Sequence, residues 1–126
     1  MSILLVFAVA LQAPAALPLG TAFGPETVIS QVGSGGLRNW RPAPGRKDVL
    51  YVRDRTERWY QVTLTGPCES LQRNLDTLSY TTDPAGRFDR FSRLQLASRP
   101  YQACGVKSLR RSTPPADAPV DRQGRR

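Results

Sequence analysis

Residues Glu57–Thr65, with the sequence ERWYQVTLT, form the clearest strand pattern in the chain. Side chains alternate along this segment, so that Tyr60, Val62 and Leu64 share one face. The other face would carry Trp59, Gln61, Thr63 and Thr65. The preceding segment Asp48–Arg53 (DVLYVR) is rich in β-branched and aromatic residues, and only a short turn at Asp54-Arg55-Thr56 separates the two. The two segments therefore predict a β-hairpin.

Further strand patterns lie on both sides of this hairpin. They are Thr27–Val32, Leu37–Arg41, a short alternation at Leu78 and Tyr80, Arg87–Ser98 with a bend near Phe91, and Tyr101–Leu109. Between them, Cys68, Leu71 and Leu75 recur at helical spacing, which predicts a short helix over Cys68–Leu75. The expected fold is mainly β, or α+β: a small curled antiparallel sheet or barrel-like sheet with one short helix and one disulfide.

The first residues have the pattern of a secretory signal. Met1–Ala22 has no charged side chain, and the apolar run Ile3–Leu11 has about half the roughly 20 residues of a membrane span. Small residues at the spacing of a cleavage site occur at Ala13-Pro14-Ala15 and at Gly20-Thr21-Ala22. We expect a signal peptide over residues 1–22, cleavage after Ala22, no transmembrane segment and a periplasmic or secreted protein. A buried N-terminal strand or helix is the alternative.

The expected compartment predicts the oxidation state of the two cysteines. Cys68 and Cys104 are 36 positions apart, too far for a CxxC redox motif. In an oxidising compartment, two cysteines in a small domain indicate one disulfide. Two separately buried thiols are the alternative.

Composition narrows the possible chemistry. The 126 residues include 18 Lys or Arg, 10 Asp or Glu and no His, which gives a formal charge of +8. Without imidazole there is no histidine base for a Ser or Cys nucleophile and no Cys/His zinc site. Asp83 and Asp89 flank a loop with too few ligands for Ca²⁺, so we expect Asp83 in a turn and Asp89 paired with Arg87 or Arg90. No metal and no cofactor are expected.

The end of the chain has a different composition. Residues 110–126 hold five Arg, two Asp and three Pro and almost no apolar side chains. Such a segment buries too little apolar surface to offset its ordering entropy. We expect a single domain over residues 23–109 and a disordered tail over residues 110–126.

Arginines supply the candidate binding residues. Arg53, Arg55 and Arg58 flank the turn of the hairpin, where guanidinium groups could bind an anion. Arg87 and Arg93 share a face if their segment is one strand. The alternative is a solvated turn of mixed charge that binds nothing. Trp59, on the outer face of its strand, is the candidate for stacking on a ligand, with ordinary cross-strand packing as the alternative.

One ordered series of motifs runs from about Thr27 to Leu109. It comprises Asn39-Trp40-Arg41-Pro42, Val49–Val52, Trp59-Tyr60 with Leu64, Gly66-Pro67-Cys68 with Leu71, Phe88-Asp89-Arg90 and Cys104. The series resembles a family of small secreted bacterial proteins known only as a domain of unknown function. The resemblance supports export and the disulfide and implies no catalytic residues. The uncharged first residues and the arginine-rich tail depart from the family pattern.

These features predict a non-enzymatic envelope protein that binds a partner protein or an anionic envelope component. A carboxylate- and arginine-based enzyme without His is an alternative. Binding of nucleic acid or another polyanion, driven by net charge, is a further one, although nucleic acid is not the usual partner of an exported protein.

Overall fold

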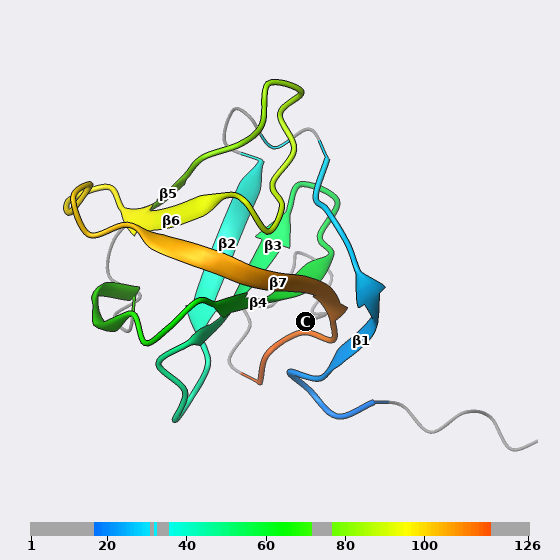
Figure 1. Ribbon diagram of the computed structural model, residues 1–126. Coiled ribbons are helices and arrows are strands. Elements are labelled where there is room, and N and C mark those ends of the chain that lie inside the picture. Colours follow the sequence, from blue (N-terminus) through cyan, green and yellow to red (C-terminus); the bar gives the residue numbers. More distant parts are fainter. Residues whose placement is uncertain (1–16, 31, 33–35, 72–76, 117–126) are drawn as a thin grey trace, which may run out of the picture.

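The structure, a computed structural model, describes residues 17–30, 32, 36–71 and 77–116 (Figure 1). Within these residues the chain forms seven strands and one 3₁₀ turn. They are β1 (Ala22–Glu26), β2 (Leu37–Pro42), β3 (Val49–Asp54), β4 (Trp59–Leu64), η1 (Glu69–Leu71), β5 (Leu78–Tyr80), β6 (Arg93–Leu96) and β7 (Cys104–Ser112). None of the helical segments in the described part of the chain is long and apolar enough to cross a membrane.

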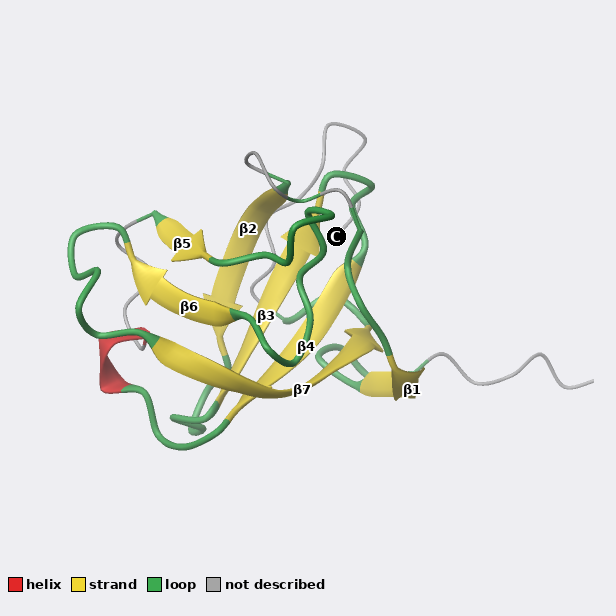
Figure 2. Ribbon diagram, turned by 45° about the horizontal axis from the view of Figure 1, so that its top comes forward, coloured by secondary structure: helices red, strands yellow, loops and turns green. Residues whose placement is uncertain are grey.

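The strands form one antiparallel sheet in the order β2-β3-β4-β7-β6-β5, and β1 pairs with β7. The long strand β7 connects its parts: it pairs with β6 at its start, with β4 along most of its length and with β1 at its end. Figures 1 and 2 show β5 and β6 lying across from β2, so that the sheet curls. The Leu37 amide of β2 donates a 3.3 Å hydrogen bond to the Tyr80 hydroxyl of β5. The expected barrel-like sheet is therefore confirmed as a nearly closed barrel.

The inner face of the curled sheet carries the main core. Tyr60, Val62 and Leu64 are all buried there, as the alternation along β4 predicts. Phe88 and Ile29 join them from the loops and form an isolated bridge with each other. Burial of a large apolar side chain contributes about 1.5–3 kcal/mol, so this inner face is the main source of stability.

The opposite face of the β2–β4 region is also covered, which corrects the expectation for Trp59. Its side chain is 3% exposed and packs in a second cluster with Ala43, Val49 and Tyr51. Segments from both ends of the chain lie over this face: the Tyr51 hydroxyl donates a 2.8 Å hydrogen bond to the Gly20 carbonyl. A Cβ at Gly20 would lie 3.1 Å from that hydroxyl and 4.0 Å from the Cα atom of Pro115. Trp59 is therefore a buried packing residue, and the expectation that its side chain is exposed for stacking on a ligand is wrong.

Three expected elements are shorter than their sequence patterns indicate. The described residues of the segment Thr27–Val32 form no strand: Ile29 bridges to Phe88 in a loop, and the Thr27 amide donates a 2.8 Å hydrogen bond to the Leu109 carbonyl of β7. Strand β6 covers only Arg93–Leu96, because the chain turns at Phe91, where a bend was expected. In place of a helix over Cys68–Leu75, the structure has the 3₁₀ turn η1, and residues 72–76 lie outside the described part. The disulfide and the hydrogen bond from the Cys68 amide to the Lys47 carbonyl fix the backbone just before this turn.

The boundary expected at Leu109 is also wrong. Strand β7 continues through Arg110 and Arg111 to Ser112, and hydrogen bonds extend this order to Thr113 and Pro114. Arg110 and Arg111 have ladder partners on both sides, in β4 and in β1, which offset their ordering entropy. The remainder of the expected disordered tail, residues 117–126, lies outside the described part of the chain.

Candidate functional site: an arginine end

The turn between β3 and β4 is held by one carboxylate. Asp54 Oδ1 accepts hydrogen bonds from the Thr56 amide (2.8 Å), the Thr56 hydroxyl (2.7 Å) and the Arg58 amide (3.0 Å). Asp54 Oδ2 accepts a 3.1 Å hydrogen bond from the Tyr60 hydroxyl. Because these bonds use both carboxylate oxygens, Asp54 fixes the conformation of the turn. The turn then presents Arg55 and Arg58 to solvent, and both are exposed.

Arg111 lies beside this turn, between two aromatic rings. Its guanidinium carbon is 5.5 Å from the centre of the Phe23 ring in β1 and 5.7 Å from that of Tyr60 in β4. Both rings belong to its cross-strand neighbours in the ladder. Arg111 buries its Nε–H group without a hydrogen-bond partner among the described residues. The rings therefore position a guanidinium group that is in none of the ion pairs identified in the described part of the chain.

Arg53 repeats this arrangement on the opposite face of the sheet. Its guanidinium carbon is 5.7 Å from the centre of the Trp59 ring, and its Nε–H group is likewise buried and unpartnered within the described chain. Arg53 pairs with Trp59, whereas Arg111 pairs with the next residue, Tyr60. Successive residues of a strand point to opposite faces, so the two arginines flank the sheet at the same end.

We call Arg53, Arg55, Arg58 and Arg111 the arginine end. They outnumber the two acidic side chains of the turn, Asp54 and Glu57. The ion pairs identified among the described residues lie elsewhere: Arg46 with Asp48, Lys47 with Glu69 and Arg87 with Asp83. The arginine end therefore carries an excess of positive charge, and none of its arginines takes part in an ion pair with another described residue.

The structure separates the remaining candidate arginines from this site. Arg87 donates a 2.7 Å charge-assisted hydrogen bond to Asp83, which also accepts from the Ala85 and Arg87 amides, as expected of a turn residue. Arg93 is exposed on β6, away from the turn. Asp89, expected to pair with an arginine, instead accepts a 2.8 Å hydrogen bond from the Phe91 amide.

Arg111 is the member of the arginine end that sequence reasoning missed. Composition assigned it to a disordered tail, and Val106 and Leu109, three residues apart with a register shift between them, give no alternating pattern that could have been extended to it. Its position is set by the pairing of β7 with both β1 and β4, which no local pattern reveals.

The site also changes the acidity of Tyr60. Burial raises the pKa of the Tyr60 hydroxyl, and the charge of Asp54 and the hydrogen bond to it raise this pKa further. The nearby charges of Arg111 and Arg58 act in the opposite direction. The net effect keeps the phenol protonated, so Tyr60 remains a hydrogen-bond donor to Asp54 at neutral pH.

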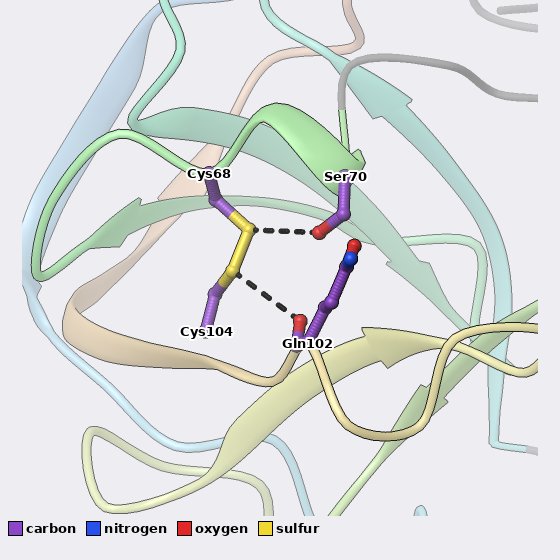
Figure 3. Close-up of a disulfide and its surroundings, with 4 residues drawn as sticks. All are labelled: Cys68, Ser70, Gln102 and Cys104. Carbon is purple, nitrogen blue, oxygen red and sulfur yellow. Dashed lines mark hydrogen bonds between the residues drawn. A yellow bond between two sulfur atoms is a disulfide. The ribbon is translucent and has the colours of Figure 1, made fainter.

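The second notable feature is the disulfide, which the structure confirms. Cys68 and Cys104 are bridged, with their Cα atoms 6.3 Å apart, and the bridge ties the segment before η1 to the start of β7 (Figure 3). The Ser70 hydroxyl lies 3.4 Å from Cys68 Sγ. The Gln102 carbonyl oxygen lies 3.8 Å from Cys104 Sγ, a contact only, since an oxidised sulfur has no proton to donate.

A wide surface hollow of about 950 Å³ lies over this bridge. Its lining mixes apolar side chains such as Leu96 with polar groups from Ser70, Arg99 and Gln102. Glu69, also in the lining, is held by Lys47 at 2.9 Å, which lowers the pKa of its carboxyl group. The hollow can offer hydrogen bonds to a polar molecule, but it lacks the charge excess of the arginine end. Within the described residues, no group of three or more Cys, Asp or Glu side chains comes together as a metal site would require.

Comparison of the chain with models of known protein families, with curated proteins and with solved structures finds no match. The resemblance to small secreted bacterial proteins therefore stays an expectation from the sequence, and the case for a function comes from the geometry of the chain itself.

Proposed function

We propose that this protein is an exported, non-enzymatic binding protein that holds an anionic polymer of the cell envelope against its arginine end. The observation that carries the proposal is a set of four arginines that form no ion pair within the described part of the chain. Two of them, Arg53 and Arg111, lie against aromatic rings. Export is supported by the signal-like first residues and by the disulfide, which is typical of oxidising compartments.

The arrangement favours a polymer over a single small anion. Arg53 and Arg111 lie on opposite faces of the sheet, and Arg55 and Arg58 occupy the turn at its end. One small anion contacts only part of such a spread set, whereas a chain of repeated negative charges can contact several members at once. Stacking on rings has already restricted the side chains of Arg53 and Arg111, so less entropy is lost when they bind.

Binding assays with the oxidised protein test the proposal. The probe is a fluorescently labelled polyphosphate, followed by fluorescence anisotropy at low and high salt. Each arginine near an anionic surface contributes about 1 kcal/mol, so the triple variant Arg53→Gln, Arg55→Gln, Arg58→Gln should lose affinity on the order of 100-fold at low salt. Its affinity should also depend less steeply on salt, because fewer counterions are released on binding.

A matched control variant distinguishes binding at the arginine end from binding that depends only on the net charge of the protein. The variant Arg90→Gln, Arg93→Gln, Arg99→Gln removes the same charge from exposed residues outside the arginine end. We expect it to keep most of the parent affinity. Equal losses in the two triple variants would show that binding follows net charge alone and would overturn the proposed site. Absence of salt-dependent binding by the parent protein would overturn the proposed function.

A further inference from the structure

Residues Pro18–Ala22, which we call the N-terminal strap, are bonded to the other end of the chain. The Thr21 amide donates to Thr113 Oγ1 (2.9 Å) and the Thr113 amide donates to the Thr21 carbonyl (3.0 Å). The Gly20 amide donates to the Pro114 carbonyl (2.8 Å), and the Thr113 hydroxyl donates to the Pro18 carbonyl (2.6 Å). These hydrogen bonds continue the pairing of β1 with β7 toward the N-terminus, and they join the strap to the fold.

The N-terminal strap also covers the second cluster of the sheet. The Gly20 carbonyl accepts the hydrogen bond from the Tyr51 hydroxyl, and Pro115, which lies against Gly20, is buried. Gly20 has a φ of +72°, a left-handed conformation that glycine adopts without the strain of a side chain. This backbone bend allows the strap to approach Tyr51 closely.

Cleavage after Ala22 would remove all of these contacts. The Thr113 amide, the Thr113 hydroxyl and the Pro114 carbonyl would lose their partners in the strap, and Tyr51 would lose its acceptor. The new α-amino group would be on Phe23, which pairs directly with Arg111. A positive charge would then lie next to the guanidinium group of Arg111, which is unfavourable. Cleavage at this position would therefore remove the strap and would also place a new positive charge beside the arginine end.

We propose that export is accompanied by cleavage after Ala15 instead, at the small-residue motif Ala13-Pro14-Ala15, so that the mature protein begins at Ala16 and keeps the N-terminal strap. The proposal rests on the export that forms part of the proposed function. A signal peptidase would hydrolyse the Ala15–Ala16 peptide bond: water adds across it, leaving a carboxylate on Ala15 and an amine on Ala16. Ala13 and Ala15 supply the small side chains that such a peptidase requires on the signal side of the bond.

The test is the N-terminal residue of the exported full chain, read by mass spectrometry after expression in a bacterium. We expect Ala16 as the first residue. Phe23 as the first residue would overturn the placement of the cut while leaving export intact. A chain that keeps Met1 would overturn both the cut and the proposed export, so the two failures are distinguishable.

Two matched substitutions sharpen the test, because each puts a larger polar side chain next to one of the two possible cuts. We expect Ala15→Gln to accumulate uncleaved precursor, whereas Ala22→Gln should be processed at the same rate and to the same first residue as the parent. The reverse pattern, with processing blocked by Ala22→Gln only, would overturn the proposal. Since both readouts concern the cleaved bond and not the folded domain, a folding defect in either variant does not affect the interpretation.

Discussion

The Tyr60 hydroxyl donates a 3.1 Å hydrogen bond to the Asp54 carboxylate, which joins the turn at the end of β3 to the buried inner face of β4. The other oxygen of Asp54 holds the amides of Thr56 and Arg58. One side chain thus couples the packing of the barrel to the conformation in which Arg55 and Arg58 are presented. The arginine end is therefore supported by the core beneath it.

Replacing Asp54 with alanine should destabilise the protein by about 2–4 kcal/mol, because several hydrogen-bond donors near or within the core would lose a charged acceptor. Tyr60→Phe removes a single donor and should cost only about 1 kcal/mol. Urea unfolding measures both. Equal costs for the two variants would contradict the role of Asp54 as the residue that organises the turn.

The raised pKa of Tyr60 predicts a loss of stability at alkaline pH. Its folded-state pKa lies above the ordinary value of 10.0, so folding favours the protonated phenol. This contribution is fully present below pH 10 and decreases as the pH rises from the unfolded toward the folded pKa. Tyr60→Phe should therefore show a shallower decrease in stability than the parent between about pH 9 and about pH 11. Parallel curves for the two proteins would show that Tyr60 titrates as it does in the unfolded chain.

The disulfide should make a large contribution to the stability of so small a domain. The chain-entropy model gives about 4 kcal/mol for a closed loop of this size. The double variant Cys68→Ser, Cys104→Ser should accordingly unfold at a much lower urea concentration, and the oxidised parent should contain no free thiol on titration. A melting temperature unaffected by reduction would contradict this expectation.

Phe23 and Phe91 form a matched pair for testing the stacked arginine. Phe23 packs against Arg111, whereas Phe91 is 78% exposed at a turn. Phe23→Ala should weaken binding to polyphosphate several-fold, because Arg111 would lose one of the two rings that position it. Phe91→Ala should leave binding unchanged. If both substitutions have the same effect, the ordering of Arg111 by Phe23 does not contribute to binding.

The inner face of the sheet could be predicted from the sequence because it follows a local period of two. Val62 is buried and Gln61 is not, as the alternation along β4 requires. The same rule failed for Trp59, because its cover comes from segments near Gly20 and Pro115 that are distant in sequence. Alternation predicts which residues share a face but not whether a face is covered.

Three of the four members of the arginine end could be predicted, and the fourth could not, for a related reason. Arg53, Arg55 and Arg58 are neighbours in sequence, so their clustering could be expected from the hairpin alone. Arg111 joins them through the pairing of β7 with β1 and β4, a long-range contact. Its local sequence is polar and rich in proline further on, and this composition indicated disorder. Strand partners on both sides overcome that local preference.

Two truncations of the C-terminal segment test where the folded domain ends. Deletion of residues 112–126 removes Ser112, which pairs with both Trp59 and Ala22, and the bonds of Thr113 and Pro114 to the N-terminal strap. Deletion of residues 117–126 leaves all of these contacts in place. Each net hydrogen bond contributes about 1 kcal/mol, so the longer deletion should lower the free energy of unfolding by several kcal/mol and the shorter one should leave it unchanged.

Urea unfolding of the oxidised proteins, followed by tryptophan fluorescence, measures this difference. Trp59 is buried and pairs with Ser112, which the longer deletion removes. If the longer deletion unfolds at the same urea concentration as the parent, the pairing of β1 and the strap with the end of β7 contributes nothing to the fold, and the proposed retention of the strap in the mature protein loses its physical reason.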